Sequence, residues 1–113
     1  MPKKNTELHI LDRLHRMAND RKNANPRASY TARLLAKGTA KIAQKVGEEA
    51  VETVIEAVAG NKKALVDESA DLLYHLVVLW ADQNIDPSDV WTALGDREGT
   101  SGLAEKAARS TKR

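Results

Sequence analysis

Four glutamates are crowded into the segment VGEEAVETVIEA, which spans residues 46–57. If this segment is helical, Glu48, Glu52 and Glu56 follow one another at intervals of four residues. Glu49 lies three residues before Glu52 and therefore on the same side. Like charges at these spacings destabilise an isolated helix. Either this face is exposed to water, or a positively charged group lies against it.

A second acidic pair follows in the segment DESAD. Glu68, Asp71 and His75 are spaced i, i+3 and i+7, which places them within about 60° of one another on a helical projection. The apolar Val78 and Leu79 continue the same stripe. Carboxylates aligned with apolar residues predict an inward orientation, where an uncompensated charge is costly.

The two acidic clusters lie at similar distances from the helix-breaking pair Gly60-Asn61. If the flanking helices pack antiparallel, residues near 50 and near 70 lie opposite each other. Five carboxylates in one pocket cannot all ionise without a cation. With no Cys and three His in the chain, oxygen ligands favour Mg²⁺ or Mn²⁺ over Zn²⁺. The predicted metal ligands are Glu48, Glu49, Glu52, Glu68 and Asp71.

Simpler interpretations of these residues remain open. A Glu-rich helical face is often solvated, and Lys45 can pair with Glu49 four residues later. Glu56, one turn beyond Glu52, is expected at the surface or outside the direct ligands. His75 is expected to be a hydrogen-bonded core residue, the alternative being that it orients Asp71 or contacts a substrate. Three aromatic residues are expected to lie in the core or at an interface: Tyr74, Trp80 and Trp91.

Charge is distributed unevenly along the chain. Residues 1–45 hold eleven Lys or Arg against three acids, and residues 46–96 hold two against eleven. A carboxylate-bound Mg²⁺ keeps open positions for substrate phosphates, and basic side chains complement a polyphosphate. Tyr30, within the basic stretch, is a candidate ligand contact. The candidate phosphate-binding cations are Arg27, Arg33, Lys37, Lys41 and Lys45.

The segments that carry these residues are all predicted to be helices. Apolar spacing, capping residues, Gly and Pro predict helices at about 6–18, 29–38, 39–59, 62–83 and 86–94, with a loop over 19–29. The segment LLYHLVVLWA at 72–81 is apolar almost all round, which predicts burial on most faces, in part by a partner subunit. The predicted fold class is all-α, with four to five helices in one domain over 1–113, of which about 98–113 form a basic tail.

Several function classes are excluded by the sequence. The absence of Cys rules out disulfides and zinc–thiolate sites. No Walker, zincin or dinucleotide-binding motif occurs. The start MPKKNTELHI has no signal-peptide apolar run, and no segment reaches about 18 uninterrupted apolar residues. We therefore expect a soluble cytoplasmic protein with no membrane partner.

The order E-E-x-x-E then E-x-x-D resembles the metal motif of the MazG-like all-α nucleoside triphosphate pyrophosphohydrolases. More narrowly, three segments resemble the phosphoribosyl-ATP pyrophosphohydrolase family of histidine biosynthesis. These are NPRASYTARLLAKGTAKIAQKVGEEAVETVIEA, DESADLLYHLVVLW and REGTSGLAEKAAR. The likeness covers about residues 5–110, nearly the whole chain.

This resemblance implies Mg²⁺-dependent hydrolysis of phosphoribosyl-ATP to phosphoribosyl-AMP and pyrophosphate, with Mn²⁺ as a substitute. It also implies a helical bundle completed by homodimerisation. By position, the family's catalytic acids match Glu48, Glu49 and Glu52, and its metal ligands match the same three with Glu68 and Asp71. Its substrate-binding positions match Ser29, Tyr30, Thr31, Arg33, Lys41 and Lys45. Which of the three glutamates is the general base stays open.

Alternative functions come from the same residues. One is a MazG-like house-cleaning enzyme that cleaves canonical or damaged (d)NTPs. A second is a helical nucleic-acid-binding dimer that uses the basic segments and needs no Mg²⁺, with strongly salt-dependent affinity. It leaves the inward Glu68 and Asp71 unexplained, so no nucleic-acid partner is expected. A non-catalytic structural dimer ranks third.

Overall fold

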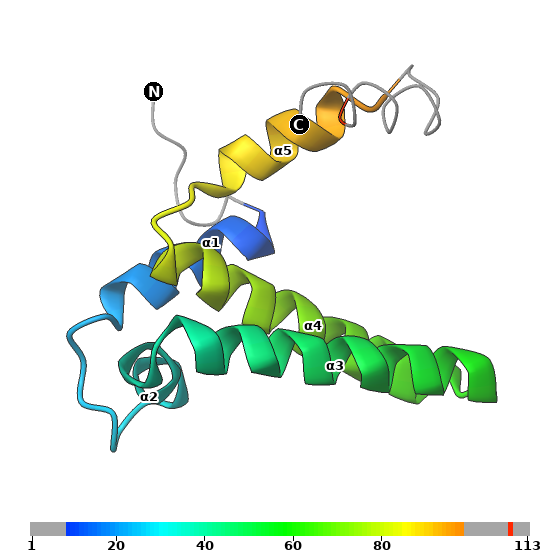
Figure 1. The fold of residues 1–113 in the computed structure, drawn as a ribbon, viewed down its shortest axis with the longest axis horizontal. Helices are drawn as coiled ribbons and strands as arrows, with labels where there is room; N and C mark the ends of the chain where they lie inside the picture. The colour runs from blue at the N-terminus through cyan, green and yellow to red at the C-terminus, as the bar shows by residue number, and fades with distance from the viewer. Residues whose placement is uncertain (1–8, 99–108, 110–113) are drawn as a thin grey trace.

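The computed structural model describes residues 9–98 and residue 109, and every regular element among them is an α-helix (Figure 1). This confirms the all-α prediction, with helix ends within a few residues of those expected. The first residues of the predicted 6–18 helix and nearly all of the predicted basic tail lie outside the described residues. No helix in the described part is long and apolar enough to cross a membrane. The helices are α1 (Ile10–Asp20), α2 (Tyr30–Lys37), α3 (Thr39–Ala59), α4 (Lys62–Asp82) and α5 (Pro87–Gly95).

The two longest helices, α3 and α4, form an antiparallel hairpin and lie side by side along their length (Figure 1). Gly60 ends α3 in the left-handed region, with a φ of 77° that L side chains rarely adopt. The Asn61 side chain then accepts a hydrogen bond from the Ala64 N–H at 3.1 Å and caps α4. These two residues reverse the chain, so the predicted opposition of residues near 50 and near 70 is confirmed.

The short helix α2 crosses the hairpin at the N-terminal end of α3 (Figure 1). Ser29 caps α2 by accepting a hydrogen bond from the Ala32 N–H at 3.2 Å. Gly38, with a φ of 94°, ends α2 and is followed directly by α3. The buried core that joins α2, α3 and α4 is made by Leu34, Ile42 and Val78, with Leu35, Tyr74 and Leu79 packed against it.

At the other end of α4, the chain turns back over α1 into α5. Asn84 adopts a φ of 57° in this turn, and its side chain accepts a hydrogen bond from Lys22 at 2.9 Å. His15 of α1 donates from Nε2 to the Ile85 carbonyl, also at 2.9 Å. Asp86 caps α5 through the Ser88 N–H at 2.8 Å. These bonds hold α1 and α5 at the end of α4 that is remote from the Gly60 turn.

Apolar side chains remain exposed on the half of the hairpin near Gly60. Val58 is 84% exposed, and Leu73 is exposed within the 72–81 segment that the sequence predicted to be buried on most faces. Large exposed apolar patches are typical of interaction surfaces. We call this set the hairpin apolar surface; its members are Val51, Val54, Ile55, Val58, Val66 and Leu73.

Candidate metal centre

Three carboxylates meet between α3 and α4. Glu49, Glu68 and Asp71 each place one oxygen so that the three atoms lie within 4.8 Å of one another. Glu49 comes from the middle of α3 and the other two from the first half of α4. The Glu49 side chain is buried, Glu68 is half-buried and Asp71 is exposed. The group is therefore buried at Glu49 and open to solvent at Asp71.

Two of these carboxylates carry an unpaired oxygen. Oε2 of Glu49 and Oε2 of Glu68 are buried, and neither has a hydrogen-bond partner among the residues that the structure describes. The pKa of Glu68 is raised from 4.5 to about 7, first by a hydrogen bond with Glu52, then by burial and by Glu49. Two carboxyl groups can share such a bond only when one of them is protonated. Glu52 therefore lies beside the group, and the crowding of the acids favours the protonated form of Glu68.

A hard divalent cation fits these residues. All the converging atoms are carboxylate oxygens, which Mg²⁺ and Mn²⁺ prefer over nitrogen or sulfur. The two buried oxygens without a partner would gain one, and a cation would replace the proton that Glu68 retains. The donor set thus supports a metal on both chemical and electrostatic grounds.

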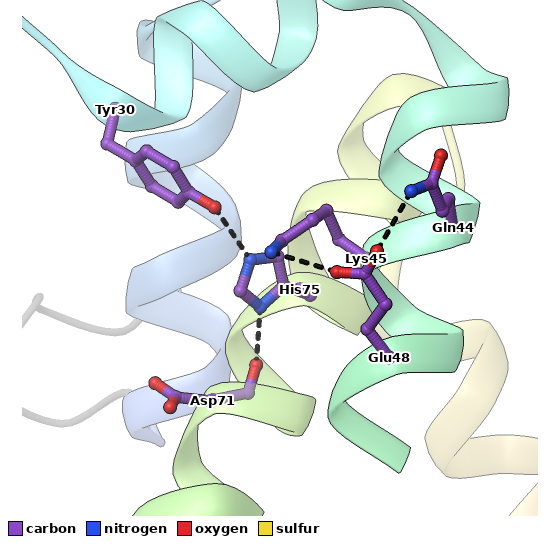
Figure 2. Close-up of polar contacts among 6 residues, drawn as sticks. All are labelled: Tyr30, Gln44, Lys45, Glu48, Asp71 and His75. Carbon is purple, nitrogen blue, oxygen red and sulfur yellow. Dashed lines mark hydrogen bonds and ion pairs between the residues drawn. The ribbon is translucent and has the colours of Figure 1, made fainter. Parts of the chain in front are cut away.

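Glu48 lies outside this group. Its carboxylate accepts one hydrogen bond from Gln44 at 2.8 Å and one from Lys45 at 3.1 Å (Figure 2). The Gln44 bond, followed by the Lys45 bond and charge, lowers the pKa of Glu48. The hydrogen bond that Lys45 donates to Glu48 also raises the pKa of Lys45. Lys45 therefore pairs with Glu48 at i,i+3, and not with Glu49 at i,i+4 as the solvated-face alternative had it.

Gln44 was not among the site residues predicted from the sequence. A signal existed, because side chains four residues apart on a helix are neighbours and can hydrogen-bond. The bond it makes holds the Glu48 side chain toward Lys45. Gln44 thus helps to separate Glu48 from the three-carboxylate group.

The hydroxyl groups predicted to contact a substrate differ in their availability. The Ser29 hydroxyl caps α2, and the buried Thr31 hydroxyl is hydrogen-bonded to the Tyr74 hydroxyl. Tyr30 is 46% exposed, and its hydroxyl lies 3.1 Å from Nε2 of His75 (Figure 2). Of the three, Tyr30 alone offers an exposed side chain to a ligand.

The predicted cations lie at different distances from the acids. Arg33 is exposed and donates from Nε to the Pro26 carbonyl at 3.3 Å, which ties it to the loop before α2. Lys41 is half-buried, and its charge is among the causes that lower the pKa of Glu48. Lys41 and Lys45 thus lie near Glu48 on α3, while Arg33 on α2 is held to the loop before that helix.

His75 is buried, as expected for a core histidine, and it is hydrogen-bonded at both ring nitrogens. Nδ1 lies 2.7 Å from the backbone carbonyl of Asp71 and Nε2 contacts Tyr30. The sequence favoured a structural role, and the burial and hydrogen bonds of His75 confirm it. The link to Tyr30 was not expected, because the two residues are 45 positions apart.

Comparisons with known proteins agree with the acidic hairpin. The family model described as phosphoribosyl-ATP pyrophosphohydrolase matches residues 11–98. A phosphoribosyl-ATP pyrophosphatase of Azospirillum brasilense is 65% identical over 102 residues, covering 90% of this chain and 92% of that protein. The protein of the same name from Parvibaculum lavamentivorans is 61% identical, with 88% and 91% covered. The one from Gluconobacter oxydans is 59% identical, with 88% and 75% covered.

Proposed function

The chain belongs to the phosphoribosyl-ATP pyrophosphohydrolase family, and we propose that it hydrolyses phosphoribosyl-ATP to phosphoribosyl-AMP and pyrophosphate, the second step of histidine biosynthesis. It is an enzyme of the hydrolase class that acts on a phosphoric anhydride. The observation that carries the proposal is the carboxylate group of Glu49, Glu68 and Asp71 in a chain that matches this family over most of its length.

We propose Mg²⁺ as the resident ion, with Mn²⁺ as a substitute. Glu49, Glu68 and Asp71 would hold it directly, and Glu52 would lie next to them. A bound Mg²⁺ neutralises charge on phosphate oxygens and orients water. The unpaired buried oxygens of Glu49 and Glu68 and the retained proton on Glu68 support this assignment.

The general base is proposed to be Glu52. The Glu49 carboxylate belongs to the three-oxygen group, and the Glu48 carboxylate is held as an anion by Gln44 and Lys45. A group whose pKa is lowered is a weaker base at neutral pH. Glu52, beside the group but outside it, is the remaining candidate to take a proton from the water that attacks the α–β phosphate linkage.

Substrate binding is assigned to residues of α2 and α3 near the carboxylate group. Lys41 and Lys45 would contact the phosphates as they leave, and Tyr30 would contact the nucleoside or ribose. Arg33 would act further out. Because the hydroxyls of Ser29 and Thr31 already have protein partners, we propose that these two residues shape the site by fixing α2.

We also propose a cytoplasmic homodimer. The hairpin apolar surface leaves Val51, Val54, Ile55 and Val58 each more than half exposed. In water, a set of β-branched side chains of this kind is stabilised by a matching surface. A second copy of the chain offers one by symmetry, and it would cover the half of the hairpin near Gly60.

The test is pyrophosphate release from phosphoribosyl-ATP, ATP and dNTPs, each with and without Mg²⁺. The variants are Glu52→Gln and, as a matched control, Asp67→Asn, an exposed acid of α4 outside the group. Metal-dependent turnover of phosphoribosyl-ATP that Glu52→Gln abolishes and Asp67→Asn keeps is the expected result. Preferred turnover of dNTPs would overturn the substrate, and release from no nucleotide would overturn the enzyme assignment.

A further inference from the structure

His75 connects two parts of the site that come from different helices. A backbone carbonyl can only accept a hydrogen bond, so the 2.7 Å contact with the Asp71 oxygen places the proton on Nδ1. In the neutral ring Nε2 is then an acceptor, and the Tyr30 hydroxyl donates to it at 3.1 Å. Figure 2 shows this chain running from Tyr30 through the imidazole to Asp71.

The two ends of this chain have different tasks. At one end, the Asp71 carbonyl belongs to the residue whose carboxylate joins Glu49 and Glu68. At the other end, Tyr30 begins α2 and leaves 46% of its surface exposed. His75 itself is only 5% exposed. The Asp71 carbonyl is fixed by α4 itself, so this bond orients the imidazole, and the imidazole in turn orients Tyr30.

The Lys45 ammonium group lies within electrostatic range of Tyr30 and Glu49. Its pKa is raised mainly by Glu48, and the charges of Tyr30 and Glu49 add to the shift. Tyr30 and Lys45 therefore face a common region beside the carboxylates. A ligand that reaches Lys45 passes close to the Tyr30 ring.

A separate set of contacts attaches α2 to α4. The Tyr74 hydroxyl is hydrogen-bonded to Thr31, and its ring stacks on Tyr30 with centroids 6.3 Å apart and packs edge-on to His75 at 5.2 Å. Removing the Tyr74 hydroxyl therefore weakens the attachment of α2 and leaves the His75 chain in place. This gives a control for helix docking alone.

We propose that His75 is a positioning residue that fixes the substrate-contacting Tyr30 relative to the metal-binding Asp71. The proposal rests on the proposed function, because it assigns Tyr30 to the substrate and Asp71 to the metal. Since the Tyr30 proton is used by the imidazole, Tyr30 meets a substrate with its ring face and an oxygen lone pair. It does not donate to a phosphate.

Two substitutions of His75 separate its two bonds. In His75→Asn the side-chain amide lies at the position of Nδ1, so it can keep the Asp71 bond but cannot reach Tyr30. In His75→Gln the amide lies at the position of Nε2, so it can accept from Tyr30 and loses the Asp71 bond. Tyr30→Phe removes the Tyr30 bond from the other side, and Tyr74→Phe is the docking control.

The expected kinetic result is a split between these variants. His75→Asn and Tyr30→Phe should each raise KM for phosphoribosyl-ATP about three- to tenfold with little change in kcat. The double variant that combines His75→Asn with Tyr30→Phe should have a KM no higher than that of the poorer single variant, because both substitutions remove the same bond between Tyr30 and His75. His75→Gln keeps an acceptor for Tyr30 and should therefore change KM less than His75→Asn does. Mn²⁺ binding, measured by calorimetry without substrate, should stay near the wild-type value in all of these variants, because none of them alters a carboxylate of the group. Tyr74→Phe should lower thermal stability and leave KM unchanged.

A readout without turnover keeps this inference distinct from the proposed function. Imidazole ¹⁵N NMR should show His75 protonated at Nδ1, and Tyr30→Phe should shift the Nε2 resonance. If the wild-type protein shows these signals but does not hydrolyse phosphoribosyl-ATP, the proposed function fails and the positioning of Tyr30 stands. Additive effects in the double variant, or a KM for phosphoribosyl-ATP that stays unchanged in His75→Asn, would overturn the positioning role.

Discussion

Glu49 on α3 and Glu68 on α4 each bury one carboxylate oxygen in the hairpin, and neither oxygen has a hydrogen-bond partner within the described chain. They are nineteen positions apart in sequence and come together because the turn at Gly60 reverses the direction of the chain. Burying an unpaired carboxylate oxygen costs stability. Two such atoms in one hairpin support the proposed cation, which would give both oxygens a partner.

Neutralising Glu49 and neutralising Glu48 should weaken Mn²⁺ binding to different extents. Glu49→Gln removes an oxygen from the three-carboxylate group, so it should weaken Mn²⁺ binding by at least about tenfold. Glu48→Gln should cause a smaller loss, because the Glu48 carboxylate is bonded to Gln44 and Lys45. Calorimetric titration of both variants checks this. A larger loss for Glu48→Gln would mean that Glu48 leaves Lys45 and binds the metal.

The metal-free protein should lose stability as the pH rises from about 4.5 to about 7. The folded pKa of Glu68 is raised from 4.5 to about 7, so in this window the folded state binds a proton that the unfolded state has lost. By linkage, the free energy of unfolding then falls with rising pH. Urea titrations of wild type and Glu68→Gln with a chelator present test this. The difference in the free energy of unfolding between wild type and Glu68→Gln should shrink below pH 4.5. A difference that does not change with pH would contradict the prediction.

Metal binding should release protons at slightly acidic pH. Glu68 holds its proton up to about pH 7, and a carboxyl group must lose it to bind a cation. The Mn²⁺ affinity should therefore rise between pH 5.5 and about 7, and calorimetry in buffers of different ionisation enthalpy should report the released proton. Glu68→Gln should show weaker binding and no proton release; proton release that persists in this variant would assign the proton elsewhere.

Replacing Gly60 and replacing Gly47 by alanine should change the free energy of unfolding in opposite directions. Gly60 has a φ of 77°, and an L residue in this region costs about 1 kcal/mol, so Gly60→Ala should lower the free energy of unfolding by about that amount. Gly47 lies within α3 with open space around its Cβ position, so Gly47→Ala should raise it by about 0.5–1 kcal/mol. Chemical denaturation measures both.

A charge on the hairpin apolar surface should separate the proposed dimer. Val54 is 61% exposed in the single chain, and Val54→Asp would bury an unpaired carboxylate in the interface. Light scattering after size exclusion should give the mass of a dimer for wild type and of a monomer for this variant. Leu94→Asp on α5, 51% exposed and outside this surface, is the control. A monomeric wild type would remove the dimer from the proposed function.

Much of the fold could be predicted from local signals in the sequence. Ser29, Gly38 and Gly60 mark helix ends by capping chemistry and backbone freedom that act within a few residues. The symmetric spacing of the two acidic clusters about Gly60 predicted that Glu49 and Glu68 would meet. Residue spacing alone therefore favoured an inward acidic face over a solvated one.

The details of the site could not be predicted in this way. Helical spacing alone cannot decide whether Lys45 turns to Glu48 or to Glu49, because both lie within reach along the helix. The bond between Tyr30 and His75 depends on how α2 crosses α4, which no local pattern encodes. The same applies to Thr31, whose hydroxyl is taken by Tyr74.

The hairpin has a further consequence for how the protein folds. All three grouped carboxylates lie between residues 49 and 71, so closing one short turn brings them together. Contacts between residues close in sequence form quickly, because little loop entropy is lost in closing them. The acidic group is thus formed by residues no further apart in sequence than Glu49 and Asp71. Its assembly therefore does not depend on the later docking of α1 and α5.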